Sequence, residues 1–342
     1  MDAKSVQSQP LAISKSPVSL ALGLGLGSGL LLVCLLCSIL LGAADISPAT
    51  VWQAIFQFDG STEHLIIRTV RLPRAILAVV VGAALAVAGA ITQGLTRNPL
   101  AAPDILGIDM GAALAMVLAI FFLGSGGSYV GFAFAGAAIA AITVYWMGSL
   151  GRSGLTPLKL VIAGAAIWYL LSSLTYGILI LSQRTLDEIR FWLAGSLAGQ
   201  DMASMLPVLP YIALGLVASL ALGRQLTLMS LGEEVAQGLG LQTAWVKAGA
   251  AIAVVLLAGS SVALAGPISF VGLVVPHVVR FAVGVDYRWI LPYSMLFGGI
   301  LLSVADLAAR LIIHPQELPV GIMTALVGAP FFIYLARSKI KR

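Results

Sequence analysis

The sequence predicts an all-α protein that crosses a membrane about ten times within one domain. Composition is the first observation: 60% of the residues are hydrophobic, only 10% are charged, and the mean hydropathy is +1.03. Soluble proteins carry about 25% charged residues. The second observation is that long apolar stretches recur along the whole chain after residue 17. A soluble fold could not bury that much apolar surface, so we interpret the chain as a polytopic membrane protein.

The start of the chain differs from the rest. Residues 1–17 are rich in Ser, Gln and Pro, which predicts a short disordered cytoplasmic tail. The apolar run from Val18 to about Ala44 is longer than the 7–15 residues of a signal-peptide core, so we expect a retained membrane helix. Cys34 and Cys37 lie inside this run, and we expect two small apolar side chains there and not a redox or metal pair.

Nine further spans follow the first one in the hydropathy pattern. They are expected at about 75–95, 105–123, 129–149, 158–182, 205–222, 243–265, 267–282, 290–311 and 320–336, which makes 18–337 one transmembrane domain, followed by a cytoplasmic tail at 338–342. Several spans are shorter than the roughly 20 residues that a full crossing needs, or contain Pro and Gly. Some helices should therefore be broken, at places that protein covers or where a cavity lies.

The basic residues predict the orientation. If both termini are cytoplasmic, every Lys falls inside, and the outer side holds arginines alone: Arg68, Arg71, Arg74, Arg184, Arg190 and Arg310. The inner side then holds Lys4, Lys15, Arg97, Arg152, Lys159, Arg224, Lys247, Arg280, Arg288, Arg337, Lys339, Lys341 and Arg342. This excess agrees with the positive-inside rule. The net charge of +5 therefore reflects membrane orientation and gives no reason to expect nucleic acid as a partner.

The sequence offers no catalytic machinery. It contains no G-x-x-x-x-G-K-[ST] phosphate loop, so any ATP hydrolysis must belong to a partner. His64, His277 and His314 are widely separated and have no Cys or carboxylate at ligand spacing, so we predict no metal site. No grouping of Ser, His and Asp indicates an intramembrane hydrolase. We expect a protein that is not an enzyme.

Polar residues gather in the segment from Arg71 to Gly111. Arg71 and Arg74 lie close to Pro73 at the predicted outer face, and a polar inner turn follows, with Gln93, Arg97, Asn98 and Asp104. Arginines at helix ends commonly extend to the membrane surface, so spacing alone supports this simple interpretation as well as a functional one.

The longest inner loop, at about 223–242, contains a second polar segment. Glu233 and Glu234 follow Gly232, and Gly238 and Gly240 come next, a pattern typical of a short helix with an acidic first turn that ends at glycine. Such a helix could fit a groove on a cytoplasmic partner. Taken on its own, however, this loop is better explained as a short helix that is exposed to solvent and contacts no partner.

A third segment runs from Gly266 to Arg280 and is followed by Asp306, Arg310 and Glu317. Asp306 and Arg310 are four residues apart and therefore share one helix face near the predicted outer end. We expect these two side chains to pair, with Glu317 close by.

Together the segments RLPR, RNPLAAPDILG, GEEVAQGLG, GPISFVGLVVPHVVR and ELPVGIMTALVGAPFF resemble the permeases of iron-siderophore and vitamin B12 ABC importers, the FecCD family. They occur in the family's order and spacing over about residues 65–337. Within the family, PDILG and VADLAARLIIHPQELPVG are most similar to iron(III) dicitrate permeases of the FecD type.

The resemblance implies a type II ABC importer permease in a bacterial inner membrane. It implies a second permease subunit, with a paralogue favoured over an identical copy. Two copies of a cytoplasmic ATPase would bind ATP and Mg, and a periplasmic solute-binding protein would deliver a ferric siderophore or iron(III) chelate. The chain itself would hold no cofactor, and transport would proceed by alternating access.

The resemblance also assigns roles to residues of this sequence. Arg71, Arg74 and Arg310 match the arginines that receive acidic residues of the binding protein. Gly232, Glu233, Glu234, Ala236 and Gly240 match the segment that contacts the ATPase. The helices at about 158–182 and 320–336 match those that line the path.

Two alternatives remain. An ion-coupled secondary transporter would place an ionisable residue at mid-membrane beside a broken helix, and the predicted spans put none there. A structural membrane protein would explain the hydropathy but not the polar segments. Co-purification with an ATPase would distinguish the ABC importer permease from both alternatives. The sequence identifies no particular chelate.

Overall fold

A computed structural model describes residues 16–42, 46–124, 129–151, 156–313 and 316–340. Within these ranges the chain is helical and has no β-strand. Six continuous helical segments are long and apolar enough to cross a membrane. They are α1 (Pro17–Leu40), α3 to α4 (Thr62–Thr96), α6 (Val130–Ser149), α7 (Pro157–Leu181), α13 to α14 (Thr243–Ala265) and α16 (Tyr287–Leu311).

The other crossings are bent or short. The helices α10 (Leu209–Ala221) and α11 (Gly223–Ser230) pass the same test only as one pair bent by 55°. Three shorter apolar helices are α5 (Ile108–Leu123), α15 (Val271–Val283) and α17 (Val320–Ile340). The described part of the chain thus has six apolar segments of membrane length, seven with the bent pair, and three shorter apolar helices; these ten segments correspond to the ten that were predicted. The helix α17 also includes residues 338–340, which the sequence had assigned to a tail.

Two long segments are interrupted by π-helical turns. The first consists of α3 (Thr62–Ile66), the π turn η1 (Ile67–Arg71) and α4 (Leu72–Thr96). The second consists of α13 (Thr243–Val254), the π turn η3 (Val255–Gly259) and α14 (Ser260–Ala265). Such turns bend a helix locally without ending it.

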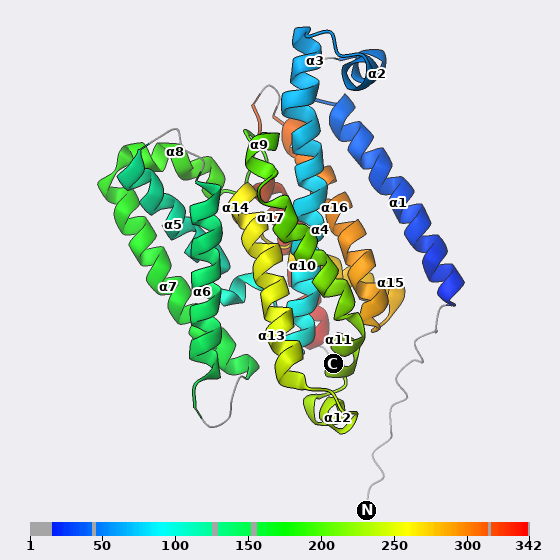
Figure 1. Cartoon of the computed structure of the whole chain (residues 1–342), viewed down its shortest axis with the longest axis vertical. Helices are drawn as coiled ribbons and strands as arrows, with labels where there is room; N and C mark the ends of the chain where they lie inside the picture. Colours follow the sequence, from blue (N-terminus) through cyan, green and yellow to red (C-terminus); the bar gives the residue numbers. More distant parts are fainter. Residues whose placement is uncertain (1–15, 43–45, 125–128, 152–155, 314–315, 341–342) are drawn as a thin grey trace, which may run out of the picture.

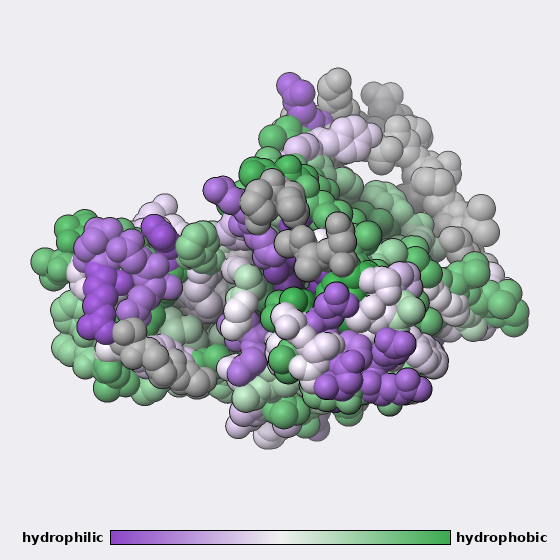
Figure 2. Space-filling model, turned by 90° about the horizontal axis from the view of Figure 1, so that it is seen from above, coloured by the Kyte–Doolittle hydropathy of each residue, from purple (hydrophilic) through white to green (hydrophobic). Residues whose placement is uncertain are grey.

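Short helices mark the two ends of the bundle (Figure 1). One end carries α2 (Pro48–Phe56), α3, α8 (Gln183–Leu193) and α9 (Met202–Met205), and we call it the α8 end. The opposite end carries α12 (Glu233–Gly238) and the start of α1, and we call it the α12 end. The hydropathy pattern predicted neither α2 nor α8, because both are too short or too polar to cross a membrane. Seen from the α8 end, hydrophilic residues group over this face while hydrophobic residues form much of the rim (Figure 2).

Helix α4 lies at the centre, and small residues let its neighbours approach closely. Gly82 faces Gly298 of α16, and Gly89 faces Gly272 of α15; a Cβ at any of these positions would meet the partner's backbone or side chains. Helices pack through such small residues in membranes, because lipid provides no hydrophobic force that drives them together.

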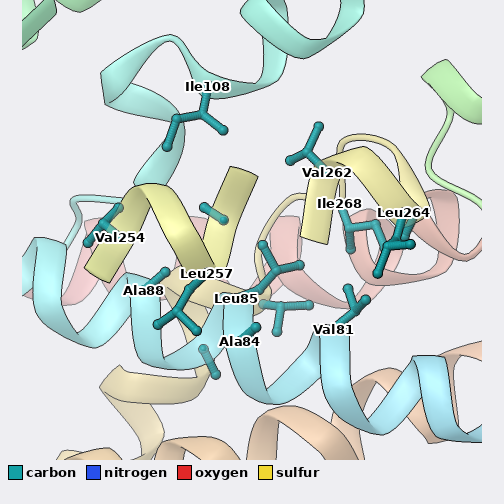
Figure 3. Packing of buried hydrophobic residues seen from close by; sticks show 14 of the residues in the cluster. Val81, Ala84, Leu85, Ala88, Ile108, Val254, Leu257, Val262, Leu264 and Ile268 are labelled. Carbon is teal, nitrogen blue, oxygen red and sulfur yellow. The ribbon is translucent and has the colours of Figure 1, made fainter. Parts of the chain in front are cut away.

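The core forms where α4 contacts the segment from α13 to α15 (Figure 3). Val81, Leu85 and Ala88 of α4 pack with Leu257 and Val262, and all five side chains are 6% exposed or less. In contrast, α1 and α7 expose many large apolar residues, such as Leu26 of α1 and Tyr169 of α7. Exposed apolar faces of this size are expected to contact lipid or other subunits.

A proline interrupts α15, and a side chain from α4 compensates for it. Pro276 has no N–H, so the carbonyl oxygen of Gly272 loses its partner four residues ahead. The Gln93 amide donates hydrogen bonds to the oxygens of Gly272 (3.3 Å) and Leu273 (3.2 Å). Gln93 in turn accepts a hydrogen bond from Arg280. Gln93 of α4 therefore provides the hydrogen-bond donor that the Gly272 oxygen lacks within α15.

Candidate functional site

Three arginines predicted to act at the outer face come together at the α8 end. Arg71, Arg74 and Arg310 line one cavity of about 140 Å³ with Glu317. They come from η1, α4 and α16, and the structure brings them together although Arg310 lies far from the other two in the sequence.

A buried carboxylate holds this cluster together. Asp306 is fully buried, and Arg74 donates hydrogen bonds to its two oxygens at 3.0 and 3.1 Å. Arg310 lies 3.2 Å from the same carboxylate, so the pairing of residues four apart is confirmed. Arg74 also contacts Glu317 at 2.5 Å, which ties the loop before α17 to α4.

The remaining arginine donors bind the end of α1. Arg71 donates to the carbonyl oxygens of Ile39 (2.9 Å) and Leu40 (2.8 Å), and Arg310 donates to that of Ser38 (3.1 Å). The last carbonyls of a helix have no partners within it and carry partial negative charge, so two cations stabilise this terminus.

This geometry changes how the three arginines could meet a partner. Arg71, Arg74 and Arg310 are only 4–6% exposed, and their hydrogen bonds go to the chain itself. An acidic residue of another protein could reach them through the small cavity, beside Glu317, whose side chain is 34% exposed. Arg74 also lines a second cavity of about 250 Å³. Their role in docking stays a prediction, and their role in bracing α1, α4 and α16 is what the geometry shows.

At the α12 end the two predicted glutamates have different environments. Glu233 accepts a hydrogen bond from Lys247 at 2.6 Å and another from Thr243 at 3.2 Å. The bond from Lys247 holds the pKa of Glu233 below its usual range. Glu234 is exposed. The sequence gave no reason to distinguish the two carboxylates, but Glu233, whose side chain is 35% exposed, attaches α12 to α13, whereas Glu234 is the more exposed of the two.

Ala236 faces the protein and not a partner. Its side chain is fully buried against Met229 and Val246. The exposed side of α12 instead carries Val235 and, at its C-cap, Leu239, which are 50% and 61% exposed and four residues apart. Leu231, 60% exposed, lies in the turn before the helix. Ala236 therefore fixes how α12 packs, while these exposed apolar residues form a stripe that another protein could contact.

Gly232 and Gly240 lie at the two ends of α12, where the backbone adopts a conformation that favours glycine. Gly232 has φ +122° and Gly240 has φ +83°, a region that residues with a Cβ rarely adopt. The predicted segment is thus a defined helix between two glycine turns, and its coupling role remains a prediction.

The predicted polar inner turn extends into the bundle. Between α4 and α5 the chain forms a 3₁₀ turn, η2 (Pro103–Leu106), whose Ile105 carbonyl lies against Gly164 of α7. Gly164 is seven residues into α7, which is roughly 10 Å along the helix at 1.5 Å per residue. The turn therefore does not stay at the surface.

Two aspartates, Asp104 on this turn and Asp109 in the first turn of α5, were not recognised as a pair. Asp104 and Asp109 line a cavity of about 200 Å³ with Phe270 and Gly272 at the start of α15. The expectation that no ionisable residue lies at mid-membrane beside a broken helix stays a prediction; Asp109, which the predicted span 105–123 includes, lies beside the start of α15. The position of Asp109 in the first turn of the short helix α5 could have indicated that it lies near the polar turn and not deep in a span.

The two described histidines, His64 of α3 and His277 of α15, have separate environments. His64 lies 2.7 Å from Asp59, and His277 packs against the rings of Phe281 and Phe331. His314 lies outside the described residues. Within the described ranges no group of three or more His, Cys, Asp or Glu side chains could hold a metal ion.

Comparison with known proteins agrees with this architecture. A solved ABC transporter described as of the metal-chelate type, in an inward-facing conformation, superimposes with a TM-score of 0.79 and 32% identity, covering 94% of this chain and all of that one. The siderophore transport system permease YfiZ of Bacillus subtilis (strain 168) is 50% identical over 314 residues, covering 91% of this chain and 94% of that protein.

Two further relatives differ in the substrate that their names record. The iron(3+)-hydroxamate permease FhuB of Bacillus subtilis (strain 168) is 48% identical over 315 residues, covering 90% of this chain and 82% of that protein. The Fe(3+) dicitrate permease FecD of Escherichia coli (strain K12) is 41% identical over 288 residues, covering 84% of this chain and 88% of that protein. The model of the FecCD transport family matches residues 30–338, and this chain belongs to that family.

Proposed function

We propose that this chain is the membrane-spanning permease subunit of an ATP-binding-cassette importer that carries a ferric siderophore or related iron(III) chelate. Membership of the FecCD transport family supports this function, as do relatives named for siderophore, hydroxamate and citrate transport. The observation that carries the proposal is α12, a rigidly held helix at one end of the bundle with an exposed apolar stripe.

The orientation follows from where the basic residues lie. The α12 end is the cytoplasmic side of a bacterial inner membrane, and both termini lie there. The positive-inside rule supports this assignment, because the lysines of the described chain, such as Lys159 and Lys247, lie at the helix ends that face α12.

The importer needs partners on three surfaces. A second permease subunit, a paralogue or an identical copy, covers the exposed apolar residues of α7 and α17, such as Tyr176 and Leu326. Two copies of a cytoplasmic ATPase, which bind ATP and Mg, contact α12. A periplasmic solute-binding protein docks at the α8 end.

Docking at the α8 end involves Glu317 as well as the arginines. A carboxylate of the binding protein would compete with Glu317 for Arg74, since Glu317 is the partly exposed member of that pair. Loss of this pair would release the loop that leads into α17. Charge reversal at Arg310 would place a carboxylate beside buried Asp306, so that variant reports on folding and not on docking.

The path from the ATPase into the membrane runs through α13. Glu233 and Lys247 join α12 to α13 by an ion pair in which Lys247 is 18% exposed. At its other end this segment reaches the α8 end, where the Ser196 amide donates to the Ala265 oxygen at 2.8 Å. A movement of α12 would therefore act on a helix that spans the whole bundle, which alternating access requires.

The test is to place a charge in the stripe. Val235→Glu should abolish co-purification of the ATPase and the ATP hydrolysis that loaded binding protein stimulates. Ser230→Glu is the matched control, because it adds the same charge at an exposed site beside the stripe. Normal co-purification of Val235→Glu would refute the assignment of α12.

The cargo is tested by uptake of radioactive iron. Cells that have this chain as their one permease of this type would be given ferric hydroxamate or ferric dicitrate. Uptake that needs both the ATPase and the binding protein supports the importer. Transport of neither chelate would refute the proposed cargo class.

Asp104 and Asp109 favour one alternative, an ion-coupled secondary transporter, since they lie beside the broken start of α15. The same uptake assay separates the two functions. Uptake that persists without the ATPase and is lost in Asp109→Asn would support ion coupling.

A further inference from the structure

The α12 end contains a further cavity, whose interior has no role in the proposed function. It measures about 410 Å³ and lies between α4, α6, α7 and α13. Its buried part is mainly apolar, with Leu106, Leu160 and Val254 at 7%, 9% and 1% exposure. Thr92 and Thr96 are also buried there, and their hydroxyls donate hydrogen bonds to backbone oxygens of α4.

Its polar lining residues lie at the helix ends. Along α13, Lys247 is followed by Val254 seven residues later, which is about 10 Å deeper at 1.5 Å per residue. On α7, Thr156 at the helix start precedes Leu160. The cavity is therefore amphipathic, with polar groups at its mouth and apolar groups inside.

The charge at the mouth is net positive. Arg97 and Lys247 carry two positive charges, and Glu233 carries one negative charge. Lys247 is occupied by Glu233. Arg97 is exposed, lines the cavity and makes no hydrogen bond within the described ranges; its charge also helps to lower the pKa of Glu233, after the larger effect of Lys247.

Two tryptophans indicate at which level of the membrane the cavity mouth lies. Trp146 of α6 and Trp245 of α13 are 61% and 75% exposed, and each is close in sequence to a lining residue, Tyr145 and Lys247. Exposed tryptophans concentrate at the level of lipid headgroups. The cavity mouth thus lies at the membrane interface and next to lipid-facing helix surfaces.

We propose that this cavity binds one anionic phospholipid from the leaflet at the α12 end, with its phosphate on Arg97 and an acyl chain among Leu106, Leu160 and Val254. A phosphodiester carries one negative charge, which matches the net charge of the mouth. An acyl chain matches the apolar interior, which a free phosphate would leave unfilled. Basic pockets between membrane helices are suited to such headgroups.

The binding site is separate from the proposed cargo path, and its mouth includes Glu233 and Lys247, the pair that joins α12 to α13. Leu160 faces the cavity, whereas Leu158 and Ile162 on α7 are 69% and 61% exposed on the other side of the helix. A path along the exposed face of α7 would therefore not pass through this cavity. Failure of the importer proposal would leave the lipid site untouched.

The experiment measures lipid retained by the full-length chain, purified with its membrane partners in mild detergent, by native mass spectrometry. Phosphatidylglycerol is titrated against phosphatidylcholine. The chain should retain one phosphatidylglycerol, and Arg97→Gln should weaken its affinity about tenfold, the equivalent of one charge-assisted hydrogen bond. Arg224→Gln is the control, since Arg224 is exposed and does not line the cavity.

A second variant tests the apolar part of the site. Ala251→Phe places a ring in the cavity without changing charge and should prevent retention of phosphatidylglycerol. Equal retention by the unmodified chain, Arg97→Gln and Ala251→Phe would overturn the proposal. Equal affinity for phosphatidylcholine, or displacement of the lipid by millimolar inorganic phosphate, would also overturn it.

Discussion

Asp306 is the residue whose replacement tests the arginine cluster most directly. The change Asp306→Asn keeps the size of the side chain and removes its charge. Arg74 and Arg310, 6% and 4% exposed, would then lie in the protein without a full counter-charge. Breaking a buried ion pair by removing one partner costs about 3–5 kcal/mol. Asn keeps one acceptor oxygen, so we expect a loss of about 3 kcal/mol in unfolding free energy.

Glu317→Gln is the matched control for this change. It is also isosteric and removes a charge from the same network, but its side chain is 34% exposed. Water can replace its contact with Arg74, so we expect a loss of under about 1 kcal/mol. The two costs should therefore differ by at least about 2 kcal/mol.

Reversible unfolding in mixed SDS micelles would measure both costs, with helix content followed by circular dichroism. Hydrogen exchange at the end of α1 gives a second measurement, because Arg310 holds the Ser38 carbonyl. Asp306→Asn should raise exchange there, and Glu317→Gln should not. A loss below about 1 kcal/mol for Asp306→Asn, or equal losses for the two variants, would refute the view that Asp306 holds the cluster together.

Three further predictions concern α4 and α12. Gln93→Leu leaves the Gly272 carbonyl without its donor and should lower the unfolding free energy by about 1–3 kcal/mol, measured as above; a neutral effect would mean that water replaces the amide. Ala236→Trp should reduce the thermal stability of the isolated chain, because Ala236 is fully buried; an unchanged melting temperature would contradict this packing. The pKa of Glu233 is lowered by Lys247, so the stabilisation by this pair is present above the ordinary pKa of 4.5 and is lost as pH falls through the lower folded-state pKa. Amide hydrogen exchange in α12, corrected for intrinsic rates, should rise on acidification in the unmodified chain and stay high at all pH values in Glu233→Gln. Identical pH profiles for the two proteins would argue against stabilisation of α12 by the Glu233–Lys247 pair.

The class of protein and its ten apolar segments could be predicted from local features of the sequence. Partition into lipid depends on the apolar character of about 20 consecutive residues, which is a local property. Local rules also predicted α12 from its glycines and first-turn glutamates, and the pairing of Asp306 with Arg310 from their spacing. The short helices α2 and α8 were missed because they do not cross the membrane.

Tertiary structure alone decided where the polar side chains lie. An arginine at a helix end has the same sequence signature whether it extends to water or is buried, and only the contact between residues 232 apart, Arg74 and Asp306, distinguishes the two. The same reason applies to Gln93, which satisfies a carbonyl 179 residues away, and to the cavity that brings Arg97 and Lys247 together. These positions depend on which helices approach closely, and pairs such as Gly82 and Gly298 set that approach through backbone contacts that hydropathy does not record.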